Sequence, residues 1–151
     1  MNPRLATIIY AALCLAGCAS SPPDSSTYAQ LGGAAGVDGI VDDLLEAILV
    51  DDRINFQFAQ TDIVRFREKL IEQLCVEGGG PCTYTGLSMQ ETHAGRGIDD
   101  VQFNALVEDL IHVMEYRNVP VPAQNRLLRR LAPMHGDIIG KPVKPLPPSP
   151  T

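Results

Sequence analysis

The sequence lacks tryptophan altogether, and aromatic residues make up only 5% of its 151 positions. Its core must therefore be built mainly from Leu, Ile, Val and Ala. A basic excess is also missing: the formal net charge is −6, which leaves no electrostatic footprint for nucleic acid. No internal repeat is visible, and the length suits a single domain with a real core.

A long hydrophobic run is the next feature that the chain lacks. The apolar stretch 5–15, which follows Arg4, is too short to anchor the chain across a bilayer, and it indicates an export signal over residues 1–17. The stretch ends in Leu15-Ala16-Gly17-Cys18, which resembles the bacterial lipobox. We therefore expect cleavage before Cys18 and lipidation of its thiol. A plain signal peptide with an incidental cysteine is the alternative.

Ala19, rather than Asp, follows the cysteine, and by resemblance to Gram-negative lipoproteins this predicts sorting to the outer membrane, on its periplasmic side. The acyl chains of a lipoprotein would anchor it firmly. We expect residues 18–27 to form a flexible tether, 28–140 the folded domain, and 141–151 a proline-rich disordered tail.

The pattern between the tether and the tail predicts an all-α domain of four main helices and short pieces, with no convincing strand. Apolar residues recur at three- and four-residue steps, which is typical of helices with one buried face. Thr61-Asp62 and Asp99-Asp100 are good helix openings. The expected inward residues are Val37, Ile40, Val41, Leu44, Leu45, Ile48 and Leu49; Ile63, Phe66, Leu70, Ile71 and Leu74; Phe103, Leu106, Val107, Leu110, Val113 and Met114; and Leu127, Leu128, Leu131, His135 and Ile138. Ile54, Phe56 and Phe58 are expected to form an apolar knot.

His93 is one of three histidines and lies on a short segment between the second and third helices, with Gly86 and Gly95 on either side. A buried imidazole on a short helix braced by loops suits a ligand of haem iron. Taken alone, however, most isolated histidines ligate nothing. The motifs around His93 must therefore show whether it is a ligand.

Those motifs together resemble the group 1 truncated haemoglobins, small bacterial and protist globins with a two-over-two helical sandwich around haem. The resemblance runs from about Tyr28 to about Ile139. It is carried by Leu31-Gly32-Gly33, Asp52-Arg53-Ile54 ahead of Phe58, Thr61-Asp62, the glycines 78–80, Tyr84-x-Gly86-x-x-Met89-x-x-x-His93, and Phe103 with Glu108-Asp109-Leu110. After His93 the chain is a few residues shorter than better-known members.

The resemblance implies a haem b cofactor with His93 as the proximal iron ligand. Phe58 matches the phenylalanine that packs flat on the haem face. Met89 lies one helical turn before His93, where the family places a bulky haem contact, although a core-filling methionine is the alternative.

On the distal side this sequence departs from the family. Many members stabilise bound oxygen with a tyrosine and glutamines, but here the corresponding residues are Leu45, Phe66 and Leu70. Bound dioxygen carries partial negative charge and needs a hydrogen-bond donor. We therefore expect Phe66 and Leu70 to contact haem without stabilising oxygen.

Lys69 has three interpretations. Its ammonium could pair with a haem propionate, it could ligate the iron as a neutral amine if burial lowers its pKa, or it could be solvated. Propionate pairing ranks first and iron ligation second. Tyr84 and Arg65 are weaker candidates for contacts at the haem edge.

The cysteines and the remaining histidines allow simpler expectations. Cys75 and Cys82 flank a glycine-rich turn, and in an exported protein such a pair predicts a disulfide. His112 shares a face with acidic residues and should be solvated. His135 is only approximately aligned with a histidine that some relatives bond to haem, so a core or pocket-lining role is preferred.

Three functions compete. The first is a membrane-tethered haem protein that binds a diatomic ligand (oxygen, nitric oxide or carbon monoxide) or passes electrons. The second is a haem enzyme that oxidises nitric oxide or reduces nitrite or peroxide, with an unidentified electron donor. An apolar pocket without a distal acid or base argues against the enzyme. The third is a globin-like interaction domain without haem, against which the retention of Phe58, Met89 and His93 argues.

Overall fold

The computed structural model of the protein describes residues 26–139. The expected export signal, Cys18 and the proline-rich tail lie outside these residues. The described elements are α1 (Thr27–Gln30), α2 (Gly33–Val50), η1 (Asn55–Phe58), α3 (Ile63–Glu77), α4 (Met89–His93), α5 (Asp100–Tyr116), α6 (Val121–Leu131), η2 (Ala132–Met134) and α7 (His135–Ile138). There is no strand within residues 26–139, so the all-α prediction is confirmed.

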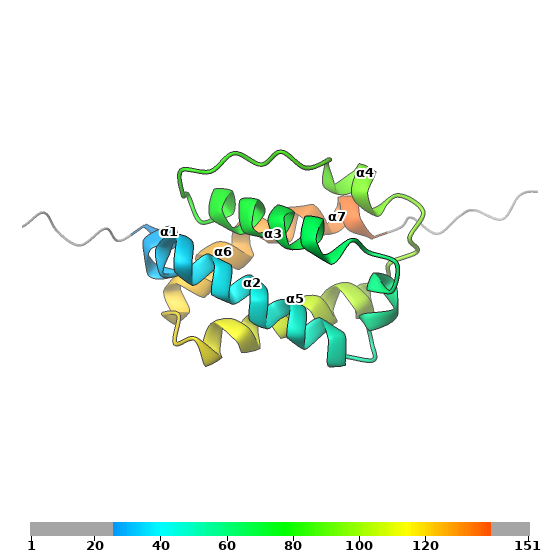
Figure 1. The fold of residues 1–151 in the computed structure, drawn as a ribbon, viewed down its shortest axis with the longest axis horizontal. Helices are drawn as coiled ribbons and strands as arrows, with labels where there is room; N and C mark the ends of the chain where they lie inside the picture. The colour runs from blue at the N-terminus through cyan, green and yellow to red at the C-terminus, as the bar shows by residue number, and fades with distance from the viewer. Residues whose placement is uncertain (1–25, 140–151) are drawn as a thin grey trace, which may run out of the picture.

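Helix α2 is the centre of the fold, because it packs against α3 on one side and α5 on the other (Figure 1). Helix α6 contacts α1, α3 and α5, and the short helices α4 and α7 contact each other. The buried apolar residues form one core and are Leu31, Val37, Ile40, Val41, Leu44, Ile48, Ile54, Leu74, Ala105, Leu110, Val113, Met114, Val119, Ala123 and Leu127.

The helix starts follow the predicted chemistry. The Asp62 carboxylate caps α3 by accepting a hydrogen bond of 3.1 Å from the backbone N–H of Arg65. Asp99 caps α5 and forms a reciprocal capping box with Gln102. Such caps satisfy backbone donors that have no partner within the helix. They fix where both helices begin beside the site described below.

Three residues expected to face inward are exposed instead. Leu49 is 65% exposed and Ile63 is 42% exposed, because each lies in a terminal turn, beyond the part of the helix that neighbours cover. Phe56 is 56% exposed, so the expected apolar knot contains only Ile54 and Phe58. Helical periodicity gives the direction of a side chain but not the length of helix that is covered.

Leu127, Leu131 and His135 were expected on the inner face of one unbroken helix, and this expectation is wrong. Helix α6 begins at Val121, with Pro122 in its first turn, and ends at Leu131. A 3₁₀ turn containing Pro133 separates it from α7. Proline has no N–H to continue the α-helical bonding pattern, so it interrupts the helix at this point.

The connection from α3 to α4 runs back along α3, on the side away from α2 (Figure 1). It starts at the Gly78–Pro81 turn, where Gly79 has a φ of +78° that favours glycine. The structure joins Cys75, at the end of α3, to Cys82 in this connection by a disulfide. The connection is therefore attached to α3 close to where it begins. Within residues 26–139, no helix is both long and apolar enough to cross a membrane.

Candidate functional site

A cavity of about 400 Å³ opens between η1, α3, α4 and α5. Apolar side chains dominate its wall, among them Phe58, Phe66, Phe103 and Leu106. Of the eight residues that the sequence suggested for cofactor contact, five line this cavity: Phe58, Phe66, Lys69, Tyr84 and His93. The structure does not bring the other three, which are Leu70, Met89 and His135, to its wall.

His93 is held at the end of α4 by bonds made within its own segment. Ser88 caps this five-residue helix, and the Glu91 carboxylate accepts a hydrogen bond of 3.0 Å from the backbone N–H of Ser88. Upstream, the Tyr84 hydroxyl donates to the carbonyl of Leu87 at 2.9 Å. A side chain at Gly86 would collide with the Tyr84 ring and displace it from its place beside Leu87. A helix this short depends on such bonds for its position.

The protonation of His93 follows from its partner. Its Nδ1 lies 2.7 Å from the carbonyl oxygen of Met89. Because a carbonyl can only accept, Nδ1 carries the proton and the lone pair of the neutral ring is on Nε2. Burial lowers the pKa of His93 and the nearby Arg96 charge lowers it further, while the bond to Met89 opposes them. The ring is therefore a neutral imidazole with a free nitrogen, the form that binds metals.

The phenylalanines form one apolar side of the cavity. The ring centroids of Phe58 and Phe66 are 5.2 Å apart, within the usual range for packed aromatic side chains. Leu45 and Leu70, the other two positions of the apolar distal set, instead pack against the core. Of that predicted set, only Phe66 lines the cavity.

Sequence reasoning missed a polar pair on the same wall. Gln57 in η1 donates a hydrogen bond of 3.1 Å to the side chain of Gln102 in α5, and both line the cavity. Gln102 is recognisable from the sequence only as the partner of Asp99 in a capping box. Gln57 stands in a 3₁₀ turn without periodicity, so nothing in the sequence marks it.

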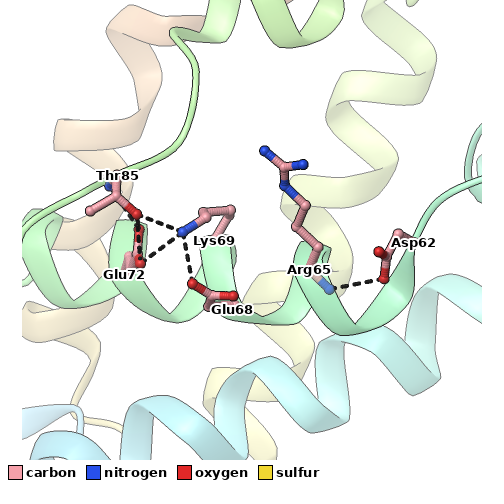
Figure 2. Close-up of polar contacts among 6 residues, drawn as sticks. All are labelled: Asp62, Arg65, Glu68, Lys69, Glu72 and Thr85. Atoms are coloured by element: carbon pink, nitrogen blue, oxygen red, sulfur yellow. Dashed lines mark hydrogen bonds and ion pairs between the residues drawn. The ribbon is translucent and has the colours of Figure 1, made fainter.

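Lys69 lines the cavity, but its ammonium is already bonded. It donates to Glu68 at 2.9 Å, to Glu72 at 2.9 Å and to Thr85 at 2.6 Å (Figure 2). These hydrogen bonds to Glu68 and Glu72 raise the pKa of Lys69, and desolvation only partly opposes them. Iron ligation by Lys69 required burial to lower this pKa, and that condition is not met in the arrangement seen here.

Two arginines add positive charge to the cavity. Arg65 extends its guanidinium from the same side of α3 as Lys69 (Figure 2). Arg96 follows α4 and donates from Nε to the carbonyl of Thr92 at 2.9 Å. The sequence suggested Arg65 but not Arg96, which lies in an irregular stretch where no periodicity shows the direction of a side chain. Asp62 is the one acidic residue among the cavity-lining residues described.

Met89 and His135 have other surroundings. Met89 lines a separate cavity of about 220 Å³ together with Met134, whose sulfur lies 3.1 Å from the Gln73 amide nitrogen. His135 is partly exposed, contacts the Phe103 ring edge-on at a centroid distance of 4.6 Å, and lies 2.9 Å from the Asp100 carboxylate. His135 thus touches the cavity only through Phe103. His112 is exposed, as expected.

Comparison with known proteins places these features in a family. Residues 26–139 match the model of the bacterial-like globin family. The chain is 32% identical to the group 1 truncated haemoglobin GlbN of Nostoc commune over 117 residues, which cover 78% of this chain and 99% of that protein. It is 35% identical to the group 1 truncated haemoglobin GlbN of Synechocystis over 100 residues, which cover 64% of this chain and 81% of the relative.

Solved structures agree with the sequence matches. The ferric truncated haemoglobin of Tetrahymena pyriformis superposes with a TM-score of 0.73 at 26% identity, covering 76% of this chain and 98% of that one. The 2/2 haemoglobin of Synechococcus sp. PCC 7002, in the cyanomet state with covalently attached haem, gives a TM-score of 0.72 at 27% identity, covering 78% and 100%. The expected all-α truncated globin fold is thereby confirmed.

Proposed function

Because this chain belongs to the bacterial-like globin family, we propose that it binds haem b in the cavity beside His93 and reversibly holds a diatomic gas there. The observation that carries the proposal is the hydrogen bond between Nδ1 of His93 and the carbonyl of Met89. It orients the ring and leaves Nε2 as the nitrogen able to bind iron. A metal-binding histidine usually donates its other nitrogen in this way.

The cavity fits such a cofactor in size and polarity. Its volume of about 400 Å³ is within the range of cofactor sites, about 300–1,000 Å³. Its wall is mainly apolar, which suits a porphyrin face, and Phe58 and Phe66 supply aromatic surface.

The charges suit the two propionates of haem. Since the Lys69 ammonium already has two carboxylate partners, we assign the propionates to Arg65 and Arg96, which line the cavity from opposite segments. Guanidinium groups bind carboxylates through paired hydrogen bonds. Bound haem supplies an iron with one position open to a diatomic ligand. Phe66 offers no hydrogen bond there, so carbon monoxide and nitric oxide should be held better than oxygen.

The test is a titration of the full chain with ferric haem, followed by visible spectroscopy. The wild type should give a saturating Soret band, and His93→Gly should lose it. Added imidazole, which fits the space left by the ring, should restore the band in His93→Gly. His112→Gly, a substitution on the exposed face of α5, should bind as the wild type does. A full Soret band in His93→Gly without imidazole would falsify the assignment.

Lipidation of Cys18 is a separate part of the proposal and rests on the lipobox in the sequence. It would tether the haem domain to a bacterial membrane, on the side where disulfides form. Cycling of the iron between its ferric and ferrous states would then require an electron donor reachable from that membrane. Labelling with a radioactive fatty acid, which Cys18→Ala should abolish, checks the anchor independently of haem.

A further inference from the structure

The bonds of Lys69 link helix α3 to the connection that leads to His93. Its ammonium reaches Glu68, Glu72 and Thr85 together, and only about a fifth of its side chain is exposed. Thr85 belongs to the connection that runs back along α3 before α4 begins (Figure 1), and its hydroxyl faces Lys69 and Glu72 (Figure 2). Lys69 therefore serves as a junction between the two walls of the cavity.

Glu72 and Glu68 are not equal partners in this junction. The Glu72 side chain is 19% exposed, and its carboxylate also accepts a hydrogen bond of 2.8 Å from the backbone N–H of Thr85. The Glu68 side chain is 61% exposed. Ion pairs in water contribute little because solvent screens them and the side chains move. Glu72, which the backbone of Thr85 holds in place, is therefore the partner that fixes the position of Lys69.

Resting on the haem binding proposed above, we propose that Glu72 is a positioning residue that holds Lys69 in its charged form, away from the iron of bound haem. Lys69 follows Phe66 by three residues on α3, and its side chain already borders the cavity. An amine must lose its proton before it can donate electrons to a metal. The carboxylates of Glu68 and Glu72 both oppose that loss, because both favour the ammonium form, but only Glu72 is also held by the backbone of Thr85. The iron of bound haem would thus remain available to a ligand from outside.

The experiment compares ferric visible spectra of the haem-loaded full chain. In the wild type, the Lys69→Ala substitution should leave the spectrum unchanged, because lysine is not a ligand. Glu72→Gln should produce a low-spin, six-coordinate spectrum, and the double variant Glu72→Gln with Lys69→Ala should return it to the wild-type form. If lysine occupies the iron about nine-tenths of the time in Glu72→Gln, cyanide should bind about tenfold more slowly than to the wild type.

Glu77→Gln is the matched control, since Glu77 lies on the same helix but pairs with Arg130. It should behave as the wild type does. Thr85→Val, which removes the hydroxyl that contacts both Lys69 and Glu72, should shift the spectrum in the same direction as Glu72→Gln, though by less.

Three results would overturn the proposal. One is a wild-type low-spin spectrum that Lys69→Ala abolishes, since Glu72 would then not keep the Lys69 amine away from the iron. Another is a Glu72→Gln spectrum identical to that of the wild type, with normal haem uptake. The third is a low-spin form that persists in the double variant. Absence of a Soret band in the wild type would instead refute haem binding itself, so the two failures are distinguishable.

Discussion

Asp109 is a buried carboxylate without full hydrogen bonding. It lies on α5, is 9% exposed, and its Oδ2 has no hydrogen-bond partner within residues 26–139. Burial raises the pKa of Asp109, and the negative charge of Asp51 raises it further, whereas Arg53 and His112 act in the opposite direction. Ionised Asp109 therefore destabilises the fold relative to the protonated form.

Replacing Asp109 with Asn should stabilise the protein at neutral pH. Below the unfolded-state pKa of 3.8 both states bind the proton, and stability is then lost as the pH rises through the higher pKa of the folded state. Asn keeps the shape and carries no charge, so we expect a gain of roughly 1 kcal/mol at pH 7, measured by urea unfolding. The gain should shrink towards zero in acid.

The control is Asp137→Asn, which removes an exposed carboxylate from α7 and should change stability by less than about 0.5 kcal/mol. A gain for Asp109→Asn that is equally large at pH 3.5 and pH 7 would show that the charge of Asp109 is not its cause.

At the residue scale, the sequence predicted those site residues whose positions depend on spacing within one short segment. The position of His93 at the cavity could be predicted because its spacing from Tyr84, Gly86 and Met89 resembles the family pattern within one short segment. Arg96 and Gln57 could not, since they enter the cavity from irregular backbone. Lys69 was expected at the cavity, but its hydrogen bonds were not foreseen, because Glu72 and Thr85 meet it only in the folded chain.

At the element scale, the disulfide attaches the connection between α3 and α4 to α3 near the end of that helix. Cys75 is 1% exposed, whereas Cys82 is exposed, so Cys82→Ala removes the bond with little loss of packing. The loop closed by the disulfide is short, and the chain-entropy model gives a loss of about 2–3 kcal/mol. The thermal midpoint should therefore fall by about 10 °C.

Calorimetry of the wild type with and without dithiothreitol provides the matched measurement. The reductant should lower the wild-type midpoint to that of Cys82→Ala and should leave the variant unchanged. Equal midpoints for the oxidised wild type and the variant would show that this cross-link does not stabilise the domain.

Element boundaries were predictable where a side chain bonds to the helix end, as Asp62 and Asp99 do. They were missed where the backbone alone decides. Pro133 divides the expected last helix, and His135 consequently turns towards Asp100 and Phe103 rather than continuing the inner face of α6. Periodicity continues across such a break in the sequence, although the α-helical hydrogen-bonding pattern does not.

At the scale of the whole molecule, the apolar faces of four helices predicted the fold, but they did not predict which residues line the cavity. Hydrophobic periodicity marks Phe66, Leu106 and Ile138 as inward-facing, and all three line the cavity. The same pattern marks Leu70 and Leu45, which pack into the core. The way the helices cross decides which inward residues touch one another and which border the cavity. The sequence pattern of a single helix does not contain that geometry.

The apolar wall of the cavity implies that filling it should stabilise the entire domain. A ligand that binds only the folded state adds about 4 kcal/mol when its free concentration is a thousandfold above Kd, which is a rise of about 10 °C or more in the thermal midpoint. Haem should produce this rise through both contact with the wall and a bond to His93.

Metal-free protoporphyrin has the same shape and the same carboxylates but offers no iron, so at equal concentration it should produce a smaller rise in the thermal midpoint. In His93→Ala the two compounds should shift the midpoint equally, because only contact with the wall remains. Differential scanning fluorimetry at matched concentrations measures all four shifts. Equal shifts for haem and protoporphyrin in the wild type would mean that the imidazole, although correctly oriented by Met89, does not bind the iron.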